Sequence, residues 1–302
     1  MRFKLASLTL AAVLAACAMN APPAKAQACD GQAKPGMHEA EMDFGMLDRS
    51  YKVYVPKNWD EKTRRPLVLG LHGGFGTGQI FNEQTRAAEQ ADKYNMLLVL
   101  PDGRLKSWNA GTCCGAAAKF GVRDVDFIEA LVEAVSAQYC VDKSKVFATG
   151  FSNGAMLSHR VACEKPGLLK AIAPVSGGIM SECKNGSAVS ALLIQGRDDP
   201  RIFWNGGTFD DTYRPSMREV VSALARRNGC AEQEKAVSKS ATGVECRQRT
   251  GCDGHPITYC GVDKVGHQWP GGKSYWVDEL GPNTRAFDAT AEIFKFFADQ
   301  AR

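Results

Sequence analysis

The chain has 302 residues, with 37 lysines and arginines against 33 aspartates and glutamates, and 44% of the residues are hydrophobic. This composition excludes a disordered chain and a collagen-like repeat, and the length allows a sizeable core. Arg2, Lys4 and Lys25 lie in a leader without acidic residues, which leaves 34 basic against 33 acidic residues in the rest. No basic surface therefore predicts binding to nucleic acid.

The leader, residues 1–26, predicts an export signal. Arg2 and Lys4 give a positive start, residues 5–16 are apolar, and Ala24-Lys25-Ala26 offers small residues for cleavage. The apolar run is shorter than the roughly 20 residues of a transmembrane helix, so we expect no membrane span. As an alternative, Leu14-Ala15-Ala16-Cys17 resembles a bacterial lipobox, whose signal would end before Cys17 and whose cysteine would carry a lipid anchor. Both interpretations place the protein outside the cytoplasm.

The cysteines support export. Without Cys17 ten remain, an even number that predicts up to five disulfides in an oxidising compartment. The alternative is a zinc site in the segment from Cys246 to Cys260, near His255 and His267. That segment has no C-x-x-C pair, so we expect no metal and no cofactor.

Apolar runs alternate with amphipathic segments along the rest of the chain. Strands are predicted at 51–55, 67–71, 96–100, 145–149, 171–175, 191–194 and 257–262. Helices are predicted at 82–94, 124–139, 153–163, 215–228 and 284–300, with Asp124 as an N-cap and Gly229 as a C-terminal stop. This alternation predicts an α/β fold with a mostly parallel sheet.

The segment Gly150-Phe151-Ser152-Asn153-Gly154 lies between a predicted strand and a predicted helix. This is the context of the G-x-S-x-G nucleophile elbow, in which a strained turn presents the serine hydroxyl. An earlier strand exit, Leu71-His72-Gly73-Gly74, could offer a backbone amide to a developing oxyanion. We expect the oxyanion hole to consist of the N–H groups of Gly74 and Asn153. The alternative is an ordinary turn whose serine caps a helix.

An acid and a base are expected downstream of the nucleophile. Asp198 and Asp199 follow a predicted strand, and Asp199 is favoured because the following Pro200 biases it toward an extended backbone. Asp198 is expected to bond the turn instead. His267 follows the last predicted strand in a Gly/Pro-rich loop. We therefore expect Ser152 as nucleophile, His267 as general base and Asp199 as its orienting acid.

These motifs resemble the polyhydroxybutyrate depolymerase-type esterases of the α/β-hydrolase superfamily, a group that includes feruloyl and acetylxylan esterases. The resemblance runs from about Arg49 to the C-terminus. It is carried by Leu71-His72-Gly73-Gly74, by residues 108–115 (WNAGTCCG), by residues 150–156 (GFSNGAM) and by residues 266–271 (GHQWPG). It implies that residues 27–302 form a single α/β-hydrolase catalytic domain with Ser152, Asp199 and His267 as its triad.

The acid loop departs from the family pattern. Family members commonly read His-Gly-x-x-Asp-Pro there, whereas this chain has Gln195-Gly196-Arg197-Asp198-Asp199-Pro200. The appended binding module and linker that polymer-degrading members often carry are not expected here, which favours soluble or short-chain esters.

Two further expectations concern a disulfide and the substrate surface. The strand before Ser152 and the helix after it run in opposite directions, which predicts a Cys140–Cys163 disulfide. Cys113 and Cys114 are expected to bond separate partners, and the pairing of Cys230, Cys246, Cys252 and Cys260 stays open. Trp108, Trp204 and Trp269 lie on loops near the expected site and are predicted as aromatic walls for a phenolic group or a sugar, with packing inside the loops as the alternative.

The predicted function is hydrolysis of carboxylic esters through an acyl-enzyme. The expected substrates are feruloyl or acetyl esters of plant cell-wall polysaccharide such as xylan, with a polyhydroxyalkanoate as the alternative. A serine peptidase and a non-catalytic binding protein are the remaining candidates. The sequence leaves the acyl preference and the oligomeric state open.

Overall fold

The structure is a computed structural model of the chain, and it describes residues 33–45, 47–60, 62–237 and 242–302. The predicted export signal and Cys17 lie outside the described residues and remain predictions. No helix in the described part of the chain is long and apolar enough to cross a membrane.

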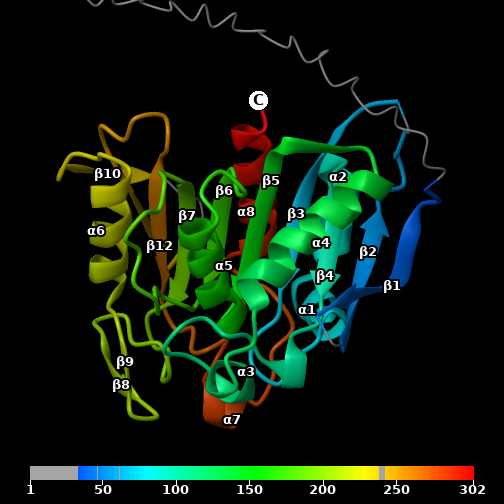
Figure 1. The fold of residues 1–302 in the computed structure, drawn as a ribbon. Coiled ribbons are helices and arrows are strands. Elements are labelled where there is room, and N and C mark those ends of the chain that lie inside the picture. The colour runs from blue at the N-terminus through cyan, green and yellow to red at the C-terminus, as the bar shows by residue number, and fades with distance from the viewer. Residues whose placement is uncertain (1–32, 46, 61, 238–241) are drawn as a thin grey trace, which may run out of the picture.

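A ten-stranded sheet runs through the described residues in the order β1-β2-β4-β3-β5-β6-β7-β12-β11-β10 (Figure 1). Strands β4, β3, β5, β6, β7 and β12 are parallel to one another, while β1 and β2 at one edge and β11 and β10 at the other are antiparallel. The mostly parallel sheet that the sequence predicts is therefore confirmed. The strands are β1 (Gly36–Phe44), β2 (Leu47–Val55), β3 (Arg65–Leu71), β4 (Leu97–Pro101), β5 (Val141–Phe151), β6 (Ala171–Val175), β7 (Ser190–Gly196), β10 (Glu234–Val237), β11 (Val244–Arg249) and β12 (Ile257–Val262).

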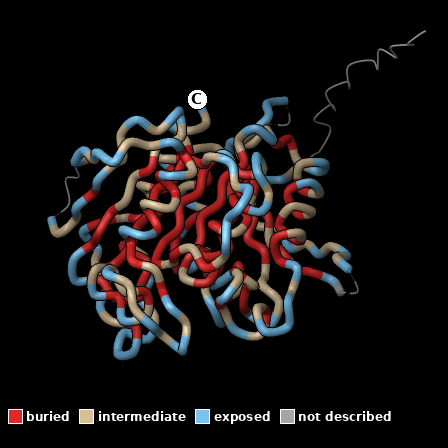
Figure 2. Tube along the Cα trace, turned by 60° about the vertical axis from the view of Figure 1, so that its left-hand side comes forward, coloured by how far each residue is buried: buried red, intermediate tan, exposed pale blue. Residues whose placement is uncertain are grey.

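Helices cover both faces of this sheet, and the buried residues follow its strands (Figure 2). One apolar core packs beneath α4 (Asp124–Gln138), α5 (Asn153–Glu164) and α6 (Met217–Arg227). The other packs beneath α1 (Gly78–Thr85), α2 (Ala87–Tyr94) and α8 (Ala289–Gln300). Strands β4, β6 and β7 are buried along their whole length, as expected for parallel strands covered on both faces.

The shorter elements lie in the loops. They are the 3₁₀ turn η1 (Arg104–Lys106), α3 (Gly115–Lys119), the hairpin of β8 (Gly207–Phe209) and β9 (Thr212–Arg214), and α7 (Val277–Leu280). In Figure 1 the labels α3, α7, β8 and β9 all lie below the sheet, on the side toward which β5 runs. This is the carboxyl edge of the parallel strands, where α/β folds place their sites.

Several predicted boundaries are corrected. The predicted helix 82–94 is two helices, because Arg86 adopts a left-handed backbone with φ 56° between α1 and α2. Asp124 is not the N-cap of α4. That position belongs to Arg123, and the Asp124 carboxylate is used elsewhere. The predicted helix 284–300 begins only at Ala289, where the Asp288 side chain caps the Ala291 amide.

The predicted Cys140–Cys163 disulfide is wrong. Cys163 bonds Cys183 instead, with 5.6 Å between the Cα atoms, and Cys140 is disulfide-bonded but not to Cys163. The 11 residues of β5 rise about 36 Å, whereas the 12 residues of α5 descend only about 18 Å. The end of α5 therefore does not reach the start of β5. Cys183 lies on the connection from β6 to β7, which returns from the carboxyl edge toward the start of β7 and brings this cysteine to the end of α5.

The other cysteines pair along the chain in ways that the sequence did not specify. Cys113 bonds its neighbour Cys114, contrary to the expectation of separate partners. Cys230 bonds Cys252, and Cys246 bonds Cys260 across the adjacent strands β11 and β12. Because these four sulfurs are joined in pairs, the zinc-site alternative is excluded for them.

Candidate active site

Ser152 sits in a strained turn between β5 and α5. Its backbone has φ 52° and ψ −117°, a conformation that serine rarely adopts. A Cβ at Gly150 would lie 2.5 Å from the Gly154 carbonyl carbon, and one at Gly154 would lie 2.2 Å from the Leu71 oxygen. Positions 150 and 154 must therefore both be glycine, since β5, α5 and the end of β3 meet here without space for a side chain.

The structure brings Ser152, His267 and Asp199 together from three strand exits. His267 Nε2 lies 2.8 Å from Ser152 Oγ, and His267 Nδ1 lies 2.8 Å from Asp199 Oδ2. Asp199 and His267 are buried, whereas Asp198 is exposed. An imidazole held between a hydroxyl and a buried carboxylate can accept the hydroxyl proton and return it to a leaving group.

The acid loop is held by the second oxygen of Asp199. Asp199 Oδ1 accepts hydrogen bonds from the amides of Arg201 and Ile202 at 2.9 and 2.8 Å. Asp199 therefore faces the imidazole with one oxygen and bonds the turn with the other. The sequence analysis had expected the side chain of Asp198 to bond the turn. The Asp198 amide donates to the Val265 carbonyl at 3.1 Å, which joins the acid loop to the loop of the histidine.

The histidine loop rests on the segment around α7. The His267 amide donates to the Leu280 carbonyl at 2.6 Å, and a Cβ at Gly266 would lie 2.1 Å from that same oxygen. Gln268 continues the contact, because its Nε2 donates to the carbonyls of Tyr275 and Gly281. The position of the imidazole thus depends on a loop that closes tightly only with glycine at position 266.

The expected oxyanion donors lie beside Ser152. Asn153 is the first residue of α5, so its amide belongs to the first-turn N–H groups without an intrahelical acceptor. A Cβ at Gly73 would lie 3.5 Å from the Ser152 Cβ, which places this loop against the serine. The next amides after Gly74 are occupied, since Phe75 N–H donates to Lys106 and Gly76 N–H donates to Gly73. Among the described residues, the Gly74 amide donates to no backbone or side-chain acceptor, so it is available to an oxyanion.

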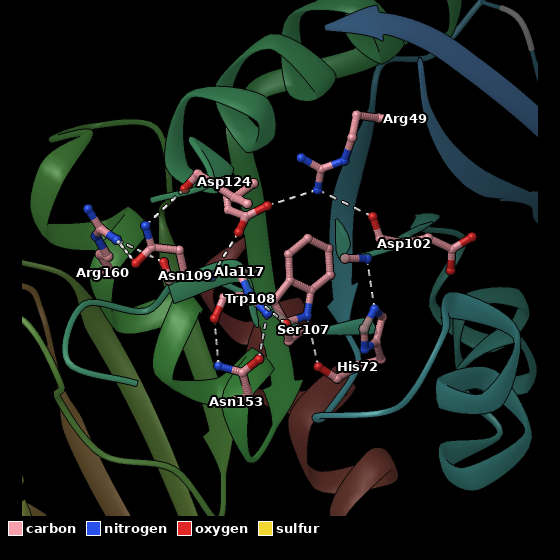
Figure 3. Close-up of polar contacts among 12 residues, drawn as sticks. Arg49, His72, Asp102, Ser107, Trp108, Asn109, Ala117, Asp124, Asn153 and Arg160 are labelled. Atoms are coloured by element: carbon pink, nitrogen blue, oxygen red, sulfur yellow. Dashed lines mark hydrogen bonds and ion pairs between the residues drawn. The ribbon is translucent and has the colours of Figure 1, made fainter. Parts of the chain in front are cut away.

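A buried hydrogen-bond network joins the two backbone segments that carry the expected oxyanion donors (Figure 3). The Asn153 side chain brackets the peptide of Trp108: Oδ1 accepts from the Trp108 amide at 2.6 Å, and Nδ2 donates to the Trp108 carbonyl at 2.9 Å. The Trp108 indole then donates to the carbonyl of His72 at 2.9 Å. The network therefore connects the residue after the serine to the residue before the glycine turn.

The His72 imidazole fixes that turn further. Nδ1 donates to the Gly73 carbonyl at 2.6 Å, and Nε2 accepts from the Gly103 amide at 2.8 Å. Burial lowers the pKa of His72, which keeps the ring neutral and able to act as donor and acceptor at once. His72 therefore holds the chain immediately before Gly74.

A buried ion pair supports the loop that contains Trp108 and Asn109 (Figure 3). Arg49 donates to Asp124 Oδ1 at 2.8 Å, and its guanidinium lies 3.8 Å from the centroid of the Phe127 ring. Asp124 Oδ2 accepts from the Asn109 amide at 2.8 Å. The sequence analysis missed this arrangement, because its predicted strand began only at residue 51. The signal was that Arg49 continues the alternation of Tyr51, Val53 and Val55 on the apolar face of that strand.

The structure contradicts the prediction of aromatic walls at Trp108 and Trp269, whose side chains are 0% and 1% exposed. Trp269 packs against Phe81 and Phe151, and its indole donates to Thr290. Both rings are part of the scaffold, because burial leaves no surface for a substrate. Trp204 is half-buried under Arg197, which lies 4.6 Å from its ring centroid, and it lines a hollow of about 660 Å³ that Ser152 does not line.

Comparison with known proteins places this geometry in a family. Residues 49–226, more than half of the chain, match the family described as esterase PHB depolymerase. A protein of Aspergillus terreus named probable feruloyl esterase C is 29% identical over 253 residues, which are 82% of this chain and 83% of that protein. Feruloyl esterase C of Emericella nidulans is 28% identical over 224 residues, which are 71% of this chain and 75% of that protein.

A solved structure supports the fold. The acetyl xylan esterase from Aspergillus awamori aligns with a TM-score of 0.58 and 18% identity, covering 80% of this chain and 97% of that one. At this identity the likeness establishes the α/β-hydrolase fold and nothing finer. Together with the family match, it shows that the chain is a carboxylic ester hydrolase with the α/β-hydrolase fold and belongs to the esterase PHB depolymerase family.

Proposed function

We propose that the protein is an exported serine esterase that hydrolyses feruloyl or acetyl esters on plant cell-wall polysaccharide fragments such as xylan. The observation that carries the serine mechanism is the hydrogen-bonded series Ser152–His267–Asp199, with both distances at 2.8 Å. The substrate class is supported by the feruloyl esterases of Aspergillus terreus and Emericella nidulans.

In the proposed mechanism Ser152 Oγ attacks the ester carbonyl while His267 Nε2 accepts its proton. Asp199 stabilises the resulting imidazolium and holds the ring in place. The amides of Gly74 and Asn153 stabilise the oxyanion of the tetrahedral intermediate. His267 then protonates the leaving alcohol, and water activated by the same imidazole releases the acid from the acyl-enzyme.

A second candidate substrate is a polyhydroxyalkanoate or its oligomers, which is favoured by the description of the matching family. A panel of methyl ferulate, acetylated xylan and polyhydroxybutyrate separates the candidates, with Ser152→Ala as the control on each substrate. We expect ferulic acid or acetate release by wild type alone. Release of hydroxybutyrate without either of these products would favour the second candidate, and no release from any of the three would refute both.

Export is part of the proposal. The four disulfides between described residues, together with the disulfide of Cys140, fit an oxidising compartment. The mass of the N-terminal peptide from the exported protein distinguishes the two signals. Cleavage after Ala26 supports free export into the periplasm or medium, whereas a diacylated Cys17 supports anchoring to the cell envelope.

A further inference from the structure

The exposed large apolar side chains of the described residues gather at one edge of the molecule. All of them lie on segments that follow the carboxyl ends of parallel strands, where Ser152 also lies. This distribution is uneven, since the rest of the described surface has no exposed large apolar side chain. Phe75 and Ile80 follow β3, Leu105 and Phe120 follow β4, Tyr213 follows β7, and Trp276 and Val277 follow β12.

The two most distinctive aromatic residues among them, Phe75 and Trp276, have an unusual backbone, and so does the aliphatic Leu105, with φ 55°. Phe75 has φ 62° and Trp276 has φ 42°, both in the left-handed region that bulky side chains avoid. Their side chains are 76% and 63% exposed, so little contact within the protein offsets the strain. Asparagine or glycine would adopt either conformation more readily. A strained, exposed aromatic residue beside a proposed active site indicates a function in binding.

Both residues lie on the loops that complete the proposed site. Phe75 immediately follows Gly74, and the donation of its amide to the Lys106 carbonyl at 2.7 Å fixes this turn. The Trp276 carbonyl accepts from the Leu280 amide at 2.8 Å, and the Leu280 carbonyl in turn accepts from the His267 amide. One aromatic side chain therefore belongs to the loop of the oxyanion donor, and the other to the segment that supports the base.

We propose that Phe75 and Trp276 contact the acyl group of the substrate and select planar aromatic acyl groups over acetyl. This inference rests on the proposed function and names the substrate class of the same site. Aromatic side chains recognise a flat apolar ring through stacked or edge contacts, whereas an acetyl group at Ser152 is too small to gain comparable contact. Phe75 and Trp276 thus take the role that the sequence analysis assigned to Trp108 and Trp269.

The test compares two esters of the same alcohol, methyl ferulate and methyl acetate, by pH-stat titration. Phe75→Asn and Trp276→Asn remove one ring each and leave a residue that tolerates the left-handed backbone. The matched control is Phe120→Asn, because Phe120 is 70% exposed at the same edge but has an ordinary φ of −96°. Thermal unfolding of each variant reports whether the fold is intact.

We expect each test variant to lower the ratio of kcat/KM for ferulate to that for acetate about tenfold, a loss typical of one good aromatic contact. The control should keep the wild-type ratio, and the melting temperature of the test variants should not fall. An unchanged ratio in both test variants, an equal change in the control, or hydrolysis of acetate alone by wild type would overturn the inference while leaving the serine esterase intact. If Ser152→Ala hydrolyses either ester as fast as wild type, the proposed function itself fails.

Discussion

The side-chain amide of Asn153 holds the peptide of Trp108 through both of its polar atoms, at 2.6 and 2.9 Å. This contact joins the residue that follows the proposed nucleophile to the loop that supports His72. The proposed backbone donors of the oxyanion hole thus depend on a side chain whose polar atoms bond the Trp108 backbone.

Asn153→Ala should therefore impair catalysis more than binding. Without the two hydrogen bonds the amides of Asn153 and Gly74 lose their relative placement, and we expect kcat to fall about 10- to 100-fold with little change in KM. Asn109→Ala is the control, because it removes hydrogen bonds on the same loop but away from Ser152. It should lower the melting temperature and leave kcat less affected than Asn153→Ala does. Steady-state kinetics on para-nitrophenyl acetate measure kcat and KM of the two variants, and thermal unfolding measures their melting temperatures. Equal losses of kcat in the two variants would contradict the positioning role.

The doubled aspartate at 198 and 199 allows a matched pair of substitutions. Asp199→Asn replaces the carboxylate that faces His267, so we expect kcat to fall about 10³- to 10⁴-fold. Asp198→Asn alters an exposed side chain and should change kcat less than about twofold, as surface substitutions usually do. A larger loss of kcat in Asp198→Asn than in Asp199→Asn would assign the role of the acid to Asp198.

The Arg49–Asp124 pair is expected to matter for stability. Its side chains are 5% and 0% exposed, so Arg49→Met would leave a buried carboxylate without its cation and should lower the free energy of unfolding by about 3–5 kcal/mol. Lys52→Met, on the same strand, removes an exposed pair with Glu39 and should cost about 0–1 kcal/mol. Urea denaturation measures both values, and a similar small loss in the two variants would refute the importance of the buried pair.

His159 on α5 predicts a pH dependence of stability. Burial lowers its pKa from 6.5 to about 3, so between these values the unfolded chain binds a proton that the folded chain does not. The stability contributed by neutral His159 is complete above about pH 6.5 and is lost as the pH falls toward 3, by about 1.4 kcal/mol per pH unit.

Replacing His159 removes its contribution to the pH dependence of stability. From pH 7 to pH 5, wild type should lose about 2 kcal/mol more stability than His159→Gln, because the titration begins near pH 6.5. Urea unfolding at both pH values measures the difference. Parallel losses in the two proteins would show that the residue titrates in the same way whether folded or unfolded.

The parallel sheet and the three side chains at its carboxyl edge could be predicted because local patterns specify them. Continuous apolar runs such as 67–71 predict buried strands, and the order serine, aspartate, histidine at successive strand exits predicts their convergence. Gly150 and Gly154 identified the turn directly, since both approach backbone too closely for any side chain.

The features that could not be predicted depend on tertiary contacts. The Arg49–Asp124 pair joins residues 75 positions apart, and the burial of Trp108 and Trp269 depends on neighbouring loops. The break at Arg86 is marked by no glycine or proline in the sequence of the predicted helix. The Cys163–Cys183 disulfide depends on how α5 crosses β5 and β6, which no spacing of cysteines encodes.

The most direct test of the proposed mechanism is to label the protein with a fluorophosphonate and locate the adduct by peptide mass spectrometry. A serine whose hydroxyl lies 2.8 Å from the His267 imidazole should react selectively, so we expect one adduct, on Ser152, absent from Ser152→Ala and formed far more slowly in His267→Ala. Labelling of another residue, or unchanged labelling in Ser152→Ala, would contradict the mechanism.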